Sequence, residues 1–125
     1  MTKPEIKISL PLIDLSDRKV LSVKECSIVL YPEHLEYKVI TKYQQLSEST
    51  DMWENVSANY RWTRKRSSIA EVNMLYCNDE QMYVVGIDVL GADSNCWHWA
   101  DPKAALAVYN QLRDYMLGKT LFVSE

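Results

Sequence analysis

Short runs of alternating apolar and polar residues recur from residue 5 to residue 100, and they constrain the fold more than any other feature. A period of two is typical of strands that face a core on one side and solvent on the other. Residues typical of turns separate the runs. We expect about seven strands, near 5–10, 21–31, 35–43, 56–66, 67–76, 81–90 and 96–100, with 67–76 also compatible with a helical turn.

The breaks between these runs predict the connections. Pro11 ends the first run because proline cannot donate to a sheet ladder, so we expect that run at a sheet edge. The Pro32-Glu33-His34 break predicts a hairpin between the second and third runs. The stretch 44–55 is polar and acidic without a clear period, and we expect a long loop there. Gly91 begins a turn that leads to the last run.

One amphipathic helix is predicted after the last strand. Asp101 suits the N-cap because its carboxylate can accept a backbone N–H, and Pro102 suits the first helical position because no N–H is needed there. Gly118 can adopt the left-handed conformation that closes many helices. Five apolar residues fall on one face of this helix and are expected to cover the core: Ala105, Val108, Tyr109, Leu112 and Met116.

Composition is that of an ordinary globular protein, with 47% apolar and 25% charged residues. No linker or repeat divides the 125 residues, so we expect a single domain over 1–125. Eight Tyr and four Trp against one Phe favour half-buried surfaces. The start of the sequence lacks a secretory signal, and no apolar run reaches membrane-spanning length. The three Cys, an odd number without a repeated spacing, fit reduced thiols. Together these features predict a cytoplasmic protein.

Seven strand-like runs followed directly by one helix resemble the pleckstrin-homology-like superfold, including its small bacterial members. The residues that carry the resemblance are SIVLYPEHLEYKVI (27–40), the basic strand leading into RSSIAEV (66–72), and YVVGIDVLGADSNCWHWADPKAALAVYNQLRDYML (83–117). The resemblance implies a mostly β, α+β fold with antiparallel strands in two packed sheets or a partly open barrel, closed by a C-terminal helix. It also implies a binding surface more than a chemical reaction.

The first hairpin turn bears on the ligand. Lipid-binding members of the superfold resemble one another in a cluster of Lys and Arg at this turn, which holds phosphorylated inositol head groups. Here the turn is Tyr31-Pro32-Glu33-His34, with an acidic residue and no Arg. We therefore expect a protein or peptide partner, or self-association into a homo-oligomer, rather than a phosphoinositide.

The most unusual local feature is RWTRKR at 61–66, four cations in six residues with no acid. We expect a solvated edge strand whose charges discourage aggregation and pair with the acidic stretch 44–55. In such a strand Arg61 and Lys65 face one side and the other cations face the opposite side. The alternative is a patch for nucleic acid or another acidic surface. Its candidate residues are Arg61, Trp62, Arg64, Lys65 and Arg66.

A secondary hypothesis concerns Trp97, His98 and Trp99, which lie just before the expected helix N-terminus. Backbone N–H groups and the helix dipole favour an anion there, so these residues are a candidate carboxylate or phosphate site. The simpler interpretation is that alternate residues of this segment pack inward beneath the helix.

No catalytic or metal-binding motif stands out. Cys77, Cys96, His98 and Asp101 could be combined into a zinc set, but they lack the paired spacing of structural zinc sites. The chain has no Gly-rich phosphate loop and no nucleophile elbow. We therefore expect no enzymatic activity, no metal and no cofactor. The predicted function is a non-enzymatic binding module for a protein or peptide partner, with nucleic-acid or acidic-surface binding as the alternative.

Overall fold

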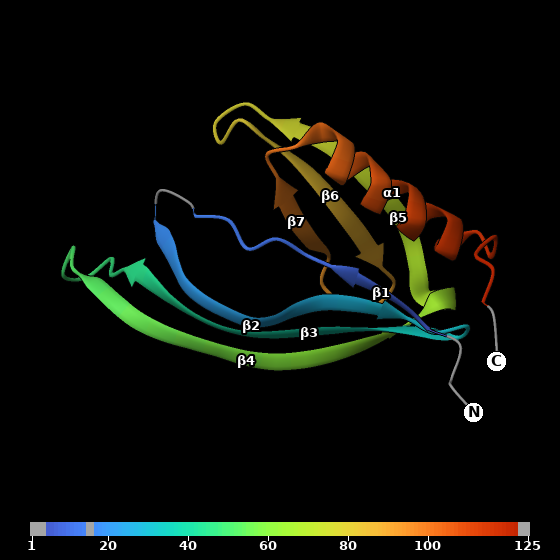
Figure 1. Cartoon of the computed structure of the whole chain (residues 1–125), viewed down its shortest axis with the longest axis horizontal. Coiled ribbons are helices and arrows are strands. Elements are labelled where there is room, and N and C mark those ends of the chain that lie inside the picture. The colour runs from blue at the N-terminus through green and yellow to red at the C-terminus, as the bar shows by residue number, and fades with distance from the viewer. Residues whose placement is uncertain (1–4, 15–16, 123–125) are drawn as a thin grey trace.

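The structure is a computed structural model, and it describes residues 5–14 and 17–122. The elements are β1 Ile6–Ser9, β2 Arg18–Leu30, β3 His34–Leu46, β4 Trp53–Lys65, the 3-10 turn η1 Arg66–Ser68, β5 Ile69–Cys77, β6 Met82–Val89, β7 Asn95–Trp99 and α1 Pro102–Met116. One sheet has the order β1-β2-β3-β4 and the other β5-β6-β7, with every strand pair antiparallel (Figure 1). Over the described residues the sheets do not close into a barrel. The predicted α+β, mostly β class is confirmed.

The first sheet is a meander of long, bent strands. β2, β3 and β4 have 13 residues each, and Figure 1 shows them curving along their length. The pairing of β2 with β3 shifts register between Val20 and Ser22 and again between Val23 and Glu25. Such bulges bend a strand and increase its twist. The concave face of the sheet is turned toward the second sheet.

The expected loop at 44–55 is wrong over half of its length. β3 continues to Leu46, β4 begins at Trp53, and only 47–52 form the turn between them. The pairing extends without a break to Leu46 opposite Trp53. A ladder satisfies backbone N–H and C=O groups whatever the side chains are. Polar side chains with both faces near solvent can therefore occupy strands, although they leave no period of two in the sequence.

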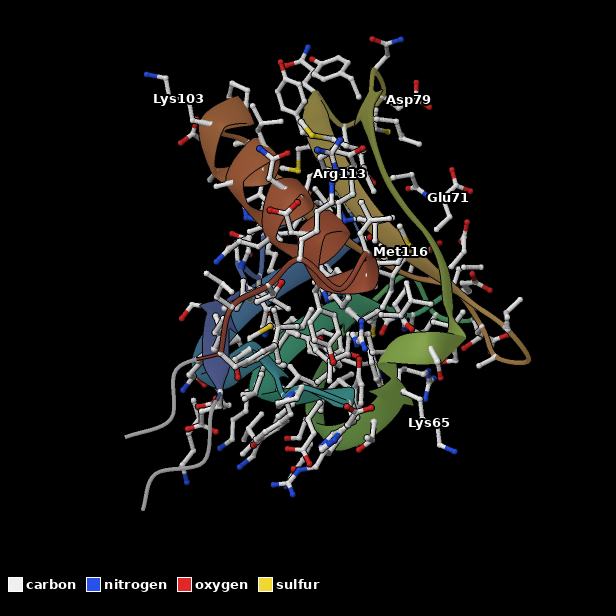
Figure 2. All side chains as sticks on the ribbon, turned by 90° about the vertical axis from the view of Figure 1, so that its right-hand side faces the viewer. Lys65, Glu71, Asp79, Lys103, Arg113 and Met116 are labelled. Carbon is white, nitrogen blue, oxygen red and sulfur yellow. The ribbon has the colours of Figure 1, made fainter. Side chains whose placement is uncertain are left out.

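The second sheet includes β5, so the run 67–76 begins in the single 3-10 turn η1 and is a strand from Ile69 onward. Its inner face carries Ile87 of β6 and both Trp97 and Trp99 of β7, all buried. α1 lies along this sheet, closest to β5, and covers one side of the space between the sheets (Figures 1 and 2). The start of β2, the end of β3 and the start of β4 diverge from β7 (Figure 1).

Both ends of the helix are as predicted. Asp101 is the N-cap, because its carboxylate accepts a hydrogen bond from the Lys103 N–H at 3.0 Å, and α1 begins at Pro102. Gly118 has φ of 73°. Its left-handed conformation lets the chain after α1 bond back to the last carbonyls of the helix, a common way for helices to end.

The buried face of the helix differs from the predicted one. Tyr109 and Met116 are only partly buried, whereas Tyr115, which the predicted face omitted, is fully buried. The Tyr115 hydroxyl donates to the Tyr31 carbonyl at 2.6 Å, and burial raises the pKa of Tyr115 to about 12. This bond attaches the end of α1 to the β2–β3 hairpin turn. The other buried helix residues are Ala105, Val108 and Leu112.

The core is one cluster of buried residues drawn from both sheets and from α1. Ile28 and Leu35 of the first sheet, Ile87 of the second and Leu112 of the helix are among its least exposed members. Within residues 5–14 and 17–122, no helix is long and apolar enough to cross a membrane.

Candidate binding site between the two sheets

A cleft of about 290 Å³ lies between the concave face of the first sheet and β7. No residue of α1 lines it. Its volume is at the lower end for small-ligand sites, which run upward from about 300 Å³. We call it the intersheet cleft and define it by six of its lining residues: Arg18, Tyr37, Tyr43, Tyr60, Asn95 and Trp97.

Strand alternation places the tyrosines in the cleft. Tyr37 and Tyr43 lie an even number of residues apart on β3, so both side chains project from the concave face. Val39, between them on the same face, pairs with Tyr60 of β4. Trp97 reaches the cleft from the inner face of β7.

Aromatic contacts join the sheets at the base of the cleft. The Tyr37 ring centroid lies 5.7 Å from that of Tyr60, 5.0 Å from that of Trp62 and 5.6 Å from that of Trp97. Tyr37 is 5% exposed and Tyr60 is 52% exposed, so the cluster passes from core to solvent. Burial raises the pKa of Tyr37 far above its ordinary value of 10, which keeps the hydroxyl protonated and able to donate at neutral pH.

The charge of the cleft is positive. Arg18 lines it with its guanidinium carbon 5.8 Å from the centre of the Tyr43 ring, and no Asp or Glu is among the described lining residues. Arg18 makes no ion pair with any described residue. His98 also lines the cleft, but its Nε2 lies 3.3 Å from a carboxylate oxygen of Glu80. Within the described part of the chain, Arg18 is therefore the unneutralised charge of the site.

Two buried polar atoms of the cleft residues have no hydrogen-bond partner within 5–14 and 17–122. They are Nε of Arg18, a donor, and Oδ1 of Asn95, an acceptor. Leaving a buried polar atom unpaired costs about 1–3 kcal/mol, more for a charged group. A ligand that supplies one acceptor and one donor would remove this cost.

Two of the three cysteines, Cys26 and Cys96, do not add reactive chemistry to this arrangement. Burial raises the pKa of the Cys26 thiol and that of the Cys96 thiol, so both are protonated and weakly nucleophilic at neutral pH. In the part of the chain that the structure describes, no three His, Cys, Asp or Glu side chains gather where they could hold a metal ion. Cys77, Cys96, His98 and Asp101 accordingly do not form a ligand set.

The basic segment 61–66 is divided between the two faces of β4. Arg61 and Lys65 are exposed on the outer face, and Figure 2 shows Lys65 pointing away from the body of the protein. Arg64 is on the concave face, with its guanidinium carbon 4.6 Å from the Trp62 ring centroid. The cations of this segment do not converge on one ligand. Whether they bind nucleic acid stays a prediction.

The expected ion pairs between this segment and the acidic stretch 44–55 are not formed among the described residues. The register explains the difference, because Glu54 is opposite Gln45 while Lys65 is opposite His34. The acids and the cations therefore occupy opposite ends of a 13-residue strand. Arg66 instead lies in η1, where its Nε donates to the Pro32 carbonyl at 3.1 Å.

The secondary candidates near the helix start are mostly core residues. Trp97 and Trp99 are 6% and 5% exposed. The first turn of α1 already holds the Asp101 carboxylate as its cap, which places a negative charge where an anion would sit. An anion site at Trp97, His98 and Trp99 stays an untested prediction. Trp97 also forms part of the intersheet cleft.

Sequence reasoning did not find Arg18, Tyr60 or Asn95 as site residues. Arg18 precedes the strand expected at 21–31, and Asn95 has the character of a turn residue. The excess of Tyr and Trp over Phe was the one signal of a half-buried aromatic surface. It could not place that surface.

Comparisons with known proteins return no relative: no protein-family model matches the chain, and neither a curated protein nor a solved structure matches it. The cleft is therefore interpreted from its own residues.

Proposed function

We propose that the protein is a non-enzymatic binding module that takes a peptide segment of a protein partner in the intersheet cleft. The observation that carries this proposal is the pair of buried atoms without partners among the described residues, Arg18 Nε and Asn95 Oδ1, in an aromatic cleft. Tyrosine and tryptophan supply large rigid contact area at low cost in side-chain entropy, which is why they are enriched where peptides and proteins bind.

The order of the elements supports a second part of the proposal, a pleckstrin-homology-like fold. Four strands in one sheet are followed by three in the other and then by a helix that covers the space between them. Membership of that superfold and a cytoplasmic location remain proposals from the sequence. Nucleic-acid binding through 61–66 is less favoured, because its cations lie on different faces of β4.

The test is a selection of peptide binders from two random libraries, one displayed with free C-termini and one with free N-termini. Selected peptides are then measured by isothermal titration against wild type, Tyr60→Ala and Tyr76→Ala. The two tyrosines are matched, with exposures of 52% and 46% and one edge-to-face tyrosine contact each. Of the two, Tyr60 alone lines the cleft.

Peptides that bind wild type and Tyr76→Ala alike but bind Tyr60→Ala at least about tenfold more weakly would support the proposal, since hot-spot truncations cost about 2 kcal/mol or more. Peptides that bind all three proteins equally would show that the cleft is not the site. A failure of both libraries to yield any binder sensitive to Tyr60 would overturn the proposed function.

A further inference from the structure

The chemistry of the cleft restricts which part of a peptide it can take. Among the described lining residues its unneutralised charge is the Arg18 guanidinium, and none of them carries a carboxylate. A guanidinium presents parallel N–H groups whose spacing matches the two oxygens of a carboxylate. The favoured ligand is therefore a carboxylic acid. A neutral peptide carbonyl in the same place would leave part of the guanidinium without a hydrogen-bond partner.

Asn95 adds a requirement for a donor. Its Oδ1 is buried without a partner among the described residues, so a ligand that brings an N–H or O–H to it would satisfy this acceptor. Asn95 is on β7 and Arg18 on β2, so the acceptor and the cation come from opposite walls of the cleft. One ligand that satisfies both carries a carboxylate and a hydrogen-bond donor.

The size and the lining of the cleft further restrict the class of ligand that fits it. A volume of about 290 Å³ suits the end of a chain better than an extended segment. The exposed Tyr60 and the half-buried Tyr43 offer ring surface to an apolar or aromatic side chain. The buried Tyr37 and Trp97 line the base of the cleft. The last residue of a peptide has these groups on one α-carbon: a carboxylate, an amide N–H and a side chain.

We infer that the intersheet cleft recognises the free C-terminus of its partner. Arg18 binds the terminal carboxylate, Asn95 Oδ1 accepts the amide N–H of the last residue, and the aromatic cluster contacts its side chain. This inference rests on the proposed function and adds to it the part of the partner that is bound.

The experiment uses N-acetyl-tryptophan and N-acetyl-tryptophanamide, which share the ring and the acetyl N–H and differ in the carboxylate. Each is titrated into ¹⁵N-labelled full-length protein, and the amide shifts of residues near Arg18, Tyr43 and Asn95 are followed. Peptides from the libraries are compared in the same way as free acids and as C-terminal amides.

The variants are Arg18→Gln, Asn95→Ala and, as the matched control, Arg113→Gln. Arg113 on α1 stacks on Tyr109 at 5.7 Å, as Arg18 stacks on Tyr43 at 5.8 Å, but it does not line the cleft. We expect the acid to bind at least about tenfold more tightly than the amide, because hydrogen bonds to charged groups contribute about 1.5–3 kcal/mol. This preference should disappear in Arg18→Gln and persist in Arg113→Gln. Asn95→Ala should weaken both probes. A folded spectrum of each variant shows that lost binding is not lost structure.

Equal binding of acid and amide, or equal effects of Arg18→Gln and Arg113→Gln, would overturn the inference. The proposed function would still stand if library peptides bound through Tyr60. Conversely, if the libraries yield no Tyr60-dependent peptide while the acid still shifts amides near Arg18 and the amide does not, the carboxylate site is supported and the peptide function fails.

Discussion

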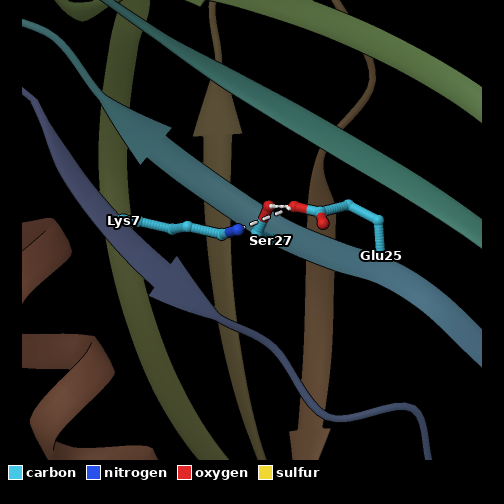
Figure 3. A network of polar contacts seen from close by, with 3 residues as sticks. All are labelled: Lys7, Glu25 and Ser27. Carbon is cyan, nitrogen blue, oxygen red and sulfur yellow. Dashed lines mark hydrogen bonds and ion pairs between the residues drawn. The ribbon is translucent and has the colours of Figure 1, made fainter.

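At the scale of single residues, the polar atoms of the cleft differ from a hydrogen-bonded network on the outer face of the first sheet. Arg18 of the concave face and Asn95 of β7 both line the cleft and carry buried atoms that lack partners among the described residues. On the outer face one network of polar groups is paired, which Figure 3 shows for Lys7, Glu25 and Ser27. The Ser27 hydroxyl, in a residue 2% exposed, donates to Glu25 Oε1 at 2.6 Å, and Lys7 Nζ lies 3.1 Å from the same oxygen. The buried atoms without partners at the cleft support the proposal that the concave face is the binding surface.

The Glu25 network predicts a pH-dependent contribution to stability. The hydrogen bond from Ser27 and the bond and charge of Lys7 hold the pKa of Glu25 below its ordinary value of 4.5. A carboxyl group with a lowered pKa in the folded state stabilises the protein above the unfolded pKa, and the stabilisation is lost as the pH falls through the folded pKa. Glu25→Gln should therefore be less stable than wild type at pH 7, and the difference should shrink below about pH 4.5.

The measurement is urea unfolding of wild type and Glu25→Gln from pH 7 to pH 3. Glu36→Gln is the control, because Glu36 lies on the same outer face and makes no ion pair with a described residue. A stability difference for Glu25→Gln that stays constant across this range would contradict the network as described.

At the scale of elements, neighbouring residues determine where the helix begins and ends, whereas pairing between distant residues determines how far the strands extend. The ends of α1 follow from Asp101, Pro102 and Gly118, whose effects act within one turn. The paired ends of β3 and β4, at 44–46 and 53–55, could not be predicted because each is a strand only through its pairing with the other. Tyr115 was missed for the same reason, since its choice over Tyr109 depends on where the β2–β3 turn lies.

Gly118 gives a prediction for the end of the helix. Gly118 and Gly91 both have positive φ, 73° and 75°, which costs a residue with a Cβ about 1–2 kcal/mol. A Cβ at Gly118 would lie 2.8 Å from Arg66 Nη1, whereas one at Gly91 would meet nothing within 4 Å. Both Gly→Ala variants should lose about 1–2 kcal/mol of unfolding free energy in urea. Gly118→Ala should lose more than Gly91→Ala because its Cβ displaces the Arg66 side chain, but only slightly more because that side chain can move. No loss at Gly118 beside a clear loss at Gly91 would refute this account of the helix end.

At the scale of the whole molecule, the two sheets depend on one shared core. Trp97 of β7 contacts Tyr37 of β3 and lies 6.5 Å from Trp62 of β4, centroid to centroid. Tyr37 and Trp97 also form the base of the intersheet cleft. Stability and binding therefore share residues, and the site cannot be separated from the contact that holds the sheets together.

Trp97→Ala tests this dependence. Removing a buried tryptophan should cost about 3–5 kcal/mol and should lower the midpoint for both sheets together. Trp53→Ala is the control: Trp53 is 40% exposed at the turn end of β4, under Lys19, and its loss should cost less than about 1 kcal/mol. Unfolding is followed by far-ultraviolet circular dichroism and by fluorescence, which should give coincident transitions. Two separate transitions in wild type would show that the sheets do not share one core.

The sequence by itself determined what depends on neighbouring residues: the mostly β class, the alternation that divides 61–66 between two faces, and the helix with its cap and closing glycine. These features follow from backbone geometry that repeats every two or 3.6 residues. The tertiary structure alone decided the length of β3 and β4, the burial of Tyr115 and the assembly of Arg18, Tyr60 and Asn95 around one cleft. Those residues come from strands far apart in the chain, and only the curvature of one sheet against the edge of the other brings them together.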